Sequence, residues 1–177
     1  FNKEQVAKDY PTLEDKRMSD WRFLIPIDKT HTVLVLGCGL GVIPIALSEQ
    51  CKKVYAVDPE WEKATFLNIR KDQLGIENLI PLQGNKIDKL PFKKESFDLV
   101  VILGNNYPMD SSYNFDLLSE QIHRLLKERG KTYFCLANKW SFQHLFTQVK
   151  TKDAKLTYNL YGYKRILEKK KFSNIRF

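Results

Sequence analysis

Short apolar runs alternate along the chain with longer segments in which apolar residues recur every three or four positions. Five of these runs predict strands, namely Thr32–Leu36, Lys53–Val57, Leu79–Leu82, Phe97–Leu103 and Lys131–Leu136. Because these runs are apolar almost throughout, without polar residues at alternate positions, each is typical of a strand buried on both faces of a parallel sheet.

Helices are predicted between these strands, at Gly41–Cys51, Trp61–Leu74 and Ser111–Glu128. Gly75 and Gly130 follow the last two helices and are expected to end them in the left-handed conformation that glycine tolerates. Strands that alternate with helices indicate the α/β class. We therefore predict a three-layer α/β/α sandwich around a mostly parallel, doubly wound sheet.

The 177 residues are enough for one domain with a core of its own, so a single domain is predicted over 1–177. Residues 1–30 are expected to form a helical cap over the ligand cleft and 31–137 the ligand-binding core. Residues 138–177 are expected to form the last helices and a partial edge strand at Phe172–Phe177. The chain begins without Met and ends inside this strand, which favours a portion of a longer protein.

Composition is that of an ordinary globular protein, with 43% apolar and 28% charged residues. No apolar run reaches the roughly 18 residues of a membrane span and no secretion signal is recognisable, so we expect a cytoplasmic protein. The cysteines Cys38, Cys51 and Cys135 have neither a disulfide pattern nor metal-ligand spacing, and no metal is predicted. The net charge of +8 comes from lysines spread over turns and helix ends, which favours a solvated surface over a focused basic patch.

The first predicted strand runs directly into a glycine-rich turn, Leu36-Gly-Cys-Gly-Leu-Gly41, and then into a helix. Glycines at 37, 39 and 41 permit dihedral angles that are costly for other residues, and they let a ligand approach the backbone. The N–H groups at the start of the helix are expected to face an anionic group. A dinucleotide-binding fingerprint needs its third glycine at position 42, where this chain has Val42, so a dehydrogenase is disfavoured.

Asp58 lies at the end of the second predicted strand, next to the strand that carries the glycine turn. A carboxylate at this position can accept hydrogen bonds from both hydroxyls of a ribose. The alternative for an Asp that precedes Pro59 is a helix cap or a turn. The neighbouring glycine turn favours ribose binding.

The glycine turn resembles motif I of the class I, Rossmann-like S-adenosylmethionine-dependent methyltransferases, and residues 30–137 resemble their type 11 group. The resemblance implies S-adenosylmethionine as cofactor and S-adenosylhomocysteine as product. It implies a cofactor site made by Gly37, Cys38, Gly39, Gly41, Asp58, Pro59, Asn85, Lys86, Asp88 and Gly104. Asn85, Lys86 and Asp88 belong to a segment that resembles the adenine-binding loop of the family, although this chain has Asn85 where an acidic residue is common. An ordinary polar loop is the alternative.

The resemblance also places the segment after the fourth strand beside the reactive sulfonium. The candidate catalytic residues, which would orient the acceptor, are therefore Asn105, Asn106 and Tyr107. Asp110 is a further candidate near the expected site, and His123, Trp21 and Tyr10 are secondary candidates. A surface or packing role is the simpler interpretation of His123, and no general base is identified.

Methyl transfer to a small molecule, a glycan or a lipid-linked acceptor is the favoured reaction, because residues 158–172 resemble methyltransferases of bacterial surface-glycan synthesis. A nucleic-acid acceptor is an alternative, because Asn105–Pro108 partly resembles the Asn-Pro-Pro-Tyr motif of adenine-N6 methyltransferases, although the Pro-Pro is missing. Val35 departs from the family, in which an acidic residue usually supports the glycine turn. This departure leaves a further hypothesis, a non-catalytic domain that binds the cofactor or a partner.

Overall fold

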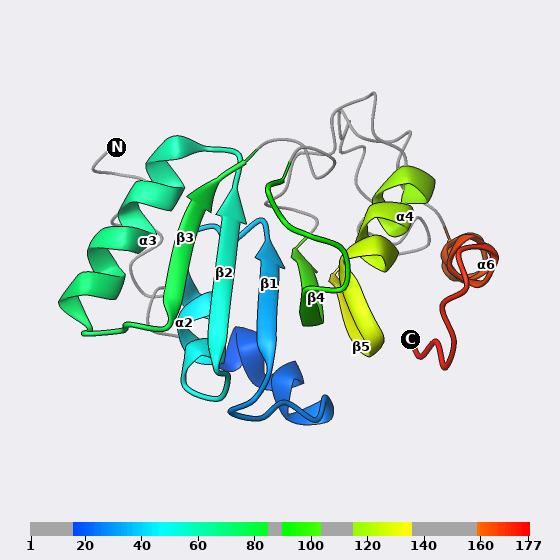
Figure 1. Cartoon of the computed structure of the whole chain (residues 1–177), viewed down its shortest axis with the longest axis horizontal. Helices are drawn as coiled ribbons and strands as arrows, with labels where there is room; N and C mark the ends of the chain where they lie inside the picture. The colour runs from blue at the N-terminus through cyan, green and yellow to red at the C-terminus, as the bar shows by residue number, and fades with distance from the viewer. Residues whose placement is uncertain (1–15, 85–89, 104–114, 136–158) are drawn as a thin grey trace, which may run out of the picture.

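The structure is a computed structural model in which residues 16–84, 90–103, 115–135 and 159–177 are described (Figure 1). Within these ranges one sheet has the strand order β3-β2-β1-β4-β5, and every neighbouring pair is parallel. The strands are β1 (Thr32–Leu36), β2 (Lys53–Asp58), β3 (Leu79–Gln83), β4 (Phe97–Leu103) and β5 (Leu126–Cys135). The predicted α/β class is confirmed.

Helices cover both faces of this sheet (Figure 1). They are α2 (Val42–Ser48), α3 (Trp61–Gln73), α4 (Phe115–Leu125) and α6 (Leu160–Lys169). Val33 and Val35 of β1 belong to one apolar core, which they share with α2 and α3. Leu34 and Leu36 belong to a second core, on the opposite face, with α4 and α6. The strand is buried from both sides, as its continuous apolar sequence predicts.

The order of the strands reverses beside β1. The chain builds outward from β1 through β2 to β3, and then returns to place β4 on the other side of β1, where Leu36 pairs with Ile102. In open parallel sheets, ligands bind beyond the carboxyl ends of the strands at such a reversal. The fold therefore directs attention to the residues that follow Leu36 and to the neighbouring end of β2.

The N-terminal segment is described from Lys16, and its 3-10 helix η1 (Lys16–Leu24) packs against α2. The ring of Trp21 stacks on Tyr133 of β5, with centroids 4.0 Å apart and planes 5° from parallel. Figure 1 shows η1 near the end of the sheet where the strands begin. The ring of Trp21 is thus partly buried against the sheet. A cap over the ligand cleft, predicted for residues 1–30, stays a prediction, because residues 1–15 lie outside the described residues.

Gly75 has φ 65 and ends α3, as predicted. Gly130 does not end a helix, because α4 already ends at Leu125 and β5 begins at the next residue. The left-handed residue here is Arg129, with φ 63. Glycine is required at 130 for another reason: a Cβ there would lie 2.9 Å from the carbonyl oxygen of Lys127.

The predicted strand at Phe172–Phe177 is wrong, since these residues are irregular. Lys171 and Asn174 have φ values of 66 and 55, which interrupt an extended conformation. The N–H of Phe172 donates to the carbonyl oxygen of Leu167 over 3.0 Å and so closes the end of α6. The apolar side chain of Phe172 packs against the core without entering the sheet.

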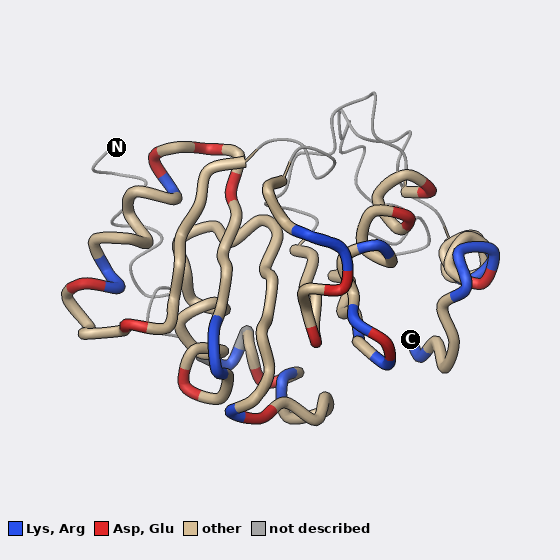
Figure 2. Tube along the Cα trace, in the orientation of Figure 1, with Lys and Arg blue, Asp and Glu red and all other residues tan. Residues whose placement is uncertain are grey.

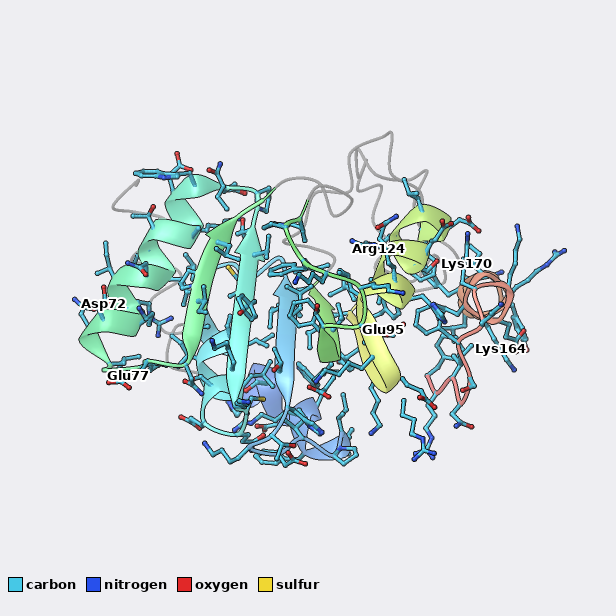
Figure 3. The ribbon with its side chains drawn as sticks, in the orientation of Figure 1. Asp72, Glu77, Glu95, Arg124, Lys164 and Lys170 are labelled. Atoms are coloured by element: carbon cyan, nitrogen blue, oxygen red, sulfur yellow. The ribbon has the colours of Figure 1, made fainter. Side chains whose placement is uncertain are left out.

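The helices α4 and α6 are joined by a charged contact at their surface (Figure 3). Lys170 Nζ lies 2.8 Å from a carboxylate oxygen of Asp116 and 2.7 Å from one of Glu120. The two acidic side chains lie four residues apart on α4, so one ammonium group reaches both. This contact helps to fix α6, which supplies Tyr163 and Leu167 to the second core.

Replacing Lys171 by Gly is expected to raise the free energy of unfolding by about 0.5–1 kcal/mol, because glycine adopts a left-handed conformation with little strain. Urea denaturation measures the change. Lys164→Gly, in the exposed middle of α6, serves as the matched control and is expected to lower the free energy of unfolding by about 1 kcal/mol. Effects of the same sign in the two variants would contradict the strain assigned to Lys171.

Candidate functional site

The turn after β1 has the backbone conformation that its glycines predict. Gly37, Gly39 and Gly41 have φ values of 79, 53 and 91, all in the left-handed region that disfavours a side chain. The N–H groups of residues 37 and 38 both donate to the carbonyl oxygen of Val57 on β2, over 2.9 and 3.3 Å. The turn is therefore fixed to the end of the neighbouring strand.

Asp58 ends β2 with a fully buried side chain that is directed at this turn. One carboxylate oxygen accepts the N–H of Gly39 over 2.9 Å, and the other accepts the N–H of Glu60 over 3.1 Å. Burial raises the pKa of the Asp58 carboxyl above its ordinary value, although both hydrogen bonds oppose this effect. Because each carboxylate oxygen can accept more than one hydrogen bond, acceptor capacity remains for a ligand.

The sequence left two roles open for Asp58, and the geometry includes the structural one. The hydrogen bond from the N–H of Glu60 to Asp58 closes a local turn, and α3 begins directly after it at Trp61. Pro59 precedes the helix and accepts a long, 3.4 Å hydrogen bond from Gln83 at the end of β3. The bond to Gly39 is different in kind, because it joins two strands at the edge where ligands are expected.

Cys38 is the one residue of the turn with a reactive side chain, and its thiol is buried. Burial raises the pKa of the Cys38 thiol far above its ordinary value, and the nearby negative charge of Asp58 adds to the rise. A thiol that stays protonated is a poor nucleophile. Cys38 can therefore contribute to the site through its backbone and its packing.

Two residues of α3 that the sequence did not single out also contact the turn. Leu67 lies under Gly41, where an added Cβ would overlap its Cδ1 atom. Arg70 donates from Nη1 to the carbonyl oxygen of Leu40 over 2.7 Å. The helical pattern could have indicated Leu67 as a buried position, but nothing local distinguishes Arg70 from a solvated arginine.

The remaining positions that the sequence singled out lie either in the core, at the surface or outside the described residues. Val35 is fully buried in the apolar core. His123 is exposed and meets the ring of Phe172 edge to face at 5.4 Å, in keeping with a surface and packing role. The predictions that lie outside the described residues are Tyr10, Asn85, Lys86, Asp88, Gly104, Asn105, Asn106, Tyr107 and Asp110.

Within the described ranges, His, Cys, Asp and Glu side chains do not come together in groups of three or more that could hold a metal ion. None of the helices placed in the structure is long and apolar enough to cross a membrane. A hollow of about 820 Å³ lies between α2 and α3, bordered by Val42, Arg70 and Asn78. It lies between the helices and is distinct from the edge where Asp58 meets the glycine turn.

Comparison with known proteins finds methyltransferases both by sequence and by structure. The methyltransferase domain family matches residues 27–176. The ribosomal RNA small subunit methyltransferases G of Legionella pneumophila strains Corby and Lens are each 29% identical over 98 residues, which is 54% of this chain and 46% of theirs. The chain thus spans about half the length of the curated relatives it matches.

Solved structures of methyltransferases share the fold. An S-adenosylmethionine-dependent methyltransferase from Aquifex aeolicus aligns with a TM-score of 0.65 and 20% identity, over 99% of this chain and 89% of its own. A geranyl diphosphate methyltransferase in complex with S-adenosylmethionine aligns with a TM-score of 0.69 and 19% identity, over 94% and 68%. The family match over residues 27–176, on this parallel sheet with its glycine turn, shows that the chain belongs to the Rossmann-like methyltransferase domain family, whose cofactor is S-adenosylmethionine.

Proposed function

We propose that the glycine turn and Asp58 hold S-adenosylmethionine, and that the domain transfers its methyl group to an acceptor. The observation that carries this proposal is the fully buried Asp58 carboxylate at the end of β2, 2.9 Å from the N–H of Gly39. A buried charge with unused acceptor capacity fits the two hydroxyls of a ribose. The left-handed glycines keep side chains out of the space beside it.

The cofactor, when bound, supplies a methyl group already activated on a positively charged sulfur. The work left to this chain is to bind, to orient the reacting groups and to exclude water, and orientation alone can supply several kcal/mol. Asp58 does its part as an anion, because hydrogen bonds to a charged acceptor are about twice as strong as neutral ones. The two backbone N–H donors on Asp58 favour that ionised form despite its burial.

The sequence candidates outside the described ranges follow the carboxyl ends of two strands. Residues 85–88 come shortly after β3, which ends at Gln83, and residues 104–107 come directly after β4, which ends at Leu103. Both strands are parallel to β1, so both ends lie at the edge that holds the glycine turn. We therefore keep Asn85, Lys86 and Asp88 as proposed adenine contacts and Gly104 as a further proposed cofactor contact. Asn105, Asn106 and Tyr107 remain the proposed acceptor-side residues.

For the acceptor, we propose an RNA. The curated relatives are named as methyltransferases of ribosomal RNA, which supports this class. Charge supports it as well: the described residues of 90–177 include twelve Lys and Arg against six Asp and Glu, whereas 16–84 has nine against eight. Figure 2 shows basic residues on the part built from β4, α4, β5 and α6, with fewer acidic residues among them, and further basic residues on the rest of the molecule. Such an uneven distribution attracts a phosphate backbone.

Asp58→Asn is expected to weaken the binding of S-adenosylhomocysteine about 10- to 100-fold, because hydrogen bonds to a charged group contribute about 1.5–3 kcal/mol. Isothermal titration calorimetry measures the affinity. Asp72→Asn removes an exposed carboxylate from the far end of α3 and is the matched control, with no expected change. Unchanged affinity in Asp58→Asn would contradict the proposed cofactor site.

Acidification provides a second check on the same residue. The pKa of Asp58 is raised in the folded protein, so protonation and the loss of affinity should begin at a higher pH than for an ordinary aspartate. The affinity of Asp58→Asn for S-adenosylhomocysteine should not show this loss at acidic pH. The sign for stability is the opposite: a raised carboxyl pKa favours the fold as pH falls through it, so lost binding cannot be attributed to weakened folding at Asp58.

Reversal of two charges tests the RNA acceptor. Lys93 and Lys94 are exposed and belong to the more basic part of the chain, residues 90–177. The double variant Lys93→Glu with Lys94→Glu should weaken the binding of purified small-subunit ribosomal RNA about tenfold. The slope of log affinity against log salt should fall by about two. Lys52→Glu with Lys53→Glu, at the start of β2, makes the same net change in charge on the other half and should have a smaller effect.

Filter binding at several salt concentrations measures both double variants. Methyl transfer is followed with S-adenosylmethionine that carries a radioactive methyl group, in a mixture of RNA, glycan and lipid fractions. Equal effects of the two double variants would contradict a directed RNA surface. Label found only in the glycan or lipid fraction would support the acceptor class favoured by the sequence and overturn the RNA proposal.

A further inference from the structure

Each of the residues 39–41 of the glycine turn has its own contact with β2 or α3. The N–H of Gly39 donates to Asp58, and the Cα of Gly41 lies against Leu67. Between them, the carbonyl oxygen of Leu40 accepts a 2.7 Å hydrogen bond from Arg70. Three consecutive residues of the turn are thus held by Asp58 at the end of β2 and by Leu67 and Arg70 of α3.

The carbonyl of Leu40 needs a partner from outside its own helix. The first hydrogen bond of α2 runs from the N–H of Ile45 to the carbonyl oxygen of Gly41, so the oxygen of Leu40 lies just outside the helical pattern. A partly buried carbonyl that loses its partner costs about 1–3 kcal/mol. Arg70 provides that partner with a charged donor, and charge-assisted hydrogen bonds are the stronger kind.

The position of Arg70 on α3 suits this contact. Leu67 and Arg70 are three residues apart, and therefore lie on the same face of the helix. Arg70 is half-buried and borders the hollow between α2 and α3 together with Val42, the first residue of α2. From there its guanidinium reaches the turn.

No acidic side chain supports the turn from β1, because position 35 is a valine. Val35 is fully buried among apolar residues and has no group that could hydrogen-bond the turn. Besides the carbonyl oxygen of Val57, the polar support described for the turn comes from the side chains of Asp58 and Arg70, both beyond β1 in the chain. Asp58 accepts an N–H of the turn, and Arg70 donates to one of its carbonyl oxygens.

We propose that Arg70 is a positioning residue for the cofactor site, which holds the Leu40 peptide so that the glycine turn is ready to receive its ligand. This inference rests on the proposed function. Binding to a turn that is already ordered avoids the loss of freedom that ordering would otherwise cost. Arg70 acts through the backbone of the turn and need not touch the cofactor.

The test compares Arg70→Met and Arg70→Lys with the unmodified chain. Arg70→Met keeps the aliphatic stem and removes every donor, and should weaken the binding of S-adenosylhomocysteine about tenfold in calorimetry. Arg70→Lys retains one charged donor and should recover part of that loss. Amide hydrogen exchange at residues 39–41 should be faster in Arg70→Met and intermediate in Arg70→Lys.

Lys71→Met is the matched control, since Lys71 is the next residue of α3 and its ammonium pairs with Asp72 at 3.2 Å. It should leave both affinity and exchange at the turn unchanged. A lower thermal midpoint in Arg70→Met with unchanged affinity would overturn the inference and leave a merely structural role. If Arg70→Met does not fold, the test rests on Arg70→Lys. An affinity of Arg70→Lys equal to that of the unmodified chain would overturn the inference, and a reduced affinity would support it. Failure of the unmodified chain to bind would instead overturn the proposed function.

Discussion

A buried carboxylate determines how the ligand-binding edge of this domain is built. Taking the charge of Asp58 out of water is costly, and the raised pKa of its carboxyl records that cost. The N–H of Gly39 must therefore point at it, and this requires the left-handed turn, with φ 53 at Gly39. Gly41 allows the turn to lie close over Leu67. The turn, the end of β2 and the face of α3 therefore depend on one another.

The parallel sheet makes this arrangement possible because it brings the carboxyl ends of neighbouring strands to the same edge. β1 is central in the sheet, and its two neighbours, β2 and β4, run in the same direction. A strand that is buried on both faces has little freedom to shift its register, since a slip of one residue would exchange its two faces. The carbonyl oxygen of Val57 then lies where the turn needs it, 2.9 Å from the N–H of Gly37.

Local sequence predicted the features that one short segment can specify. The continuous apolar strands, the glycine turn and the cap at Gly75 are of this kind. The errors occur where tertiary packing overrides local preference: Arg129 and Lys171 take left-handed conformations that the sequence would assign to glycine. Arg70 could not be predicted, because its partner is the backbone of Leu40, 30 residues earlier in the chain.

The valine at position 35 was the reason to consider a domain that binds without catalysis. That concern assumed that the turn depends on an acidic residue of β1. Here Val35 completes an apolar core, while Asp58 and Arg70 hold the turn from the next strand and helix. With valine at position 35, the turn still has its left-handed glycines and its hydrogen bonds to Asp58 and Arg70. Whether methyl transfer follows cofactor binding then depends on the residues that come after Leu103, where β4 ends beside the turn.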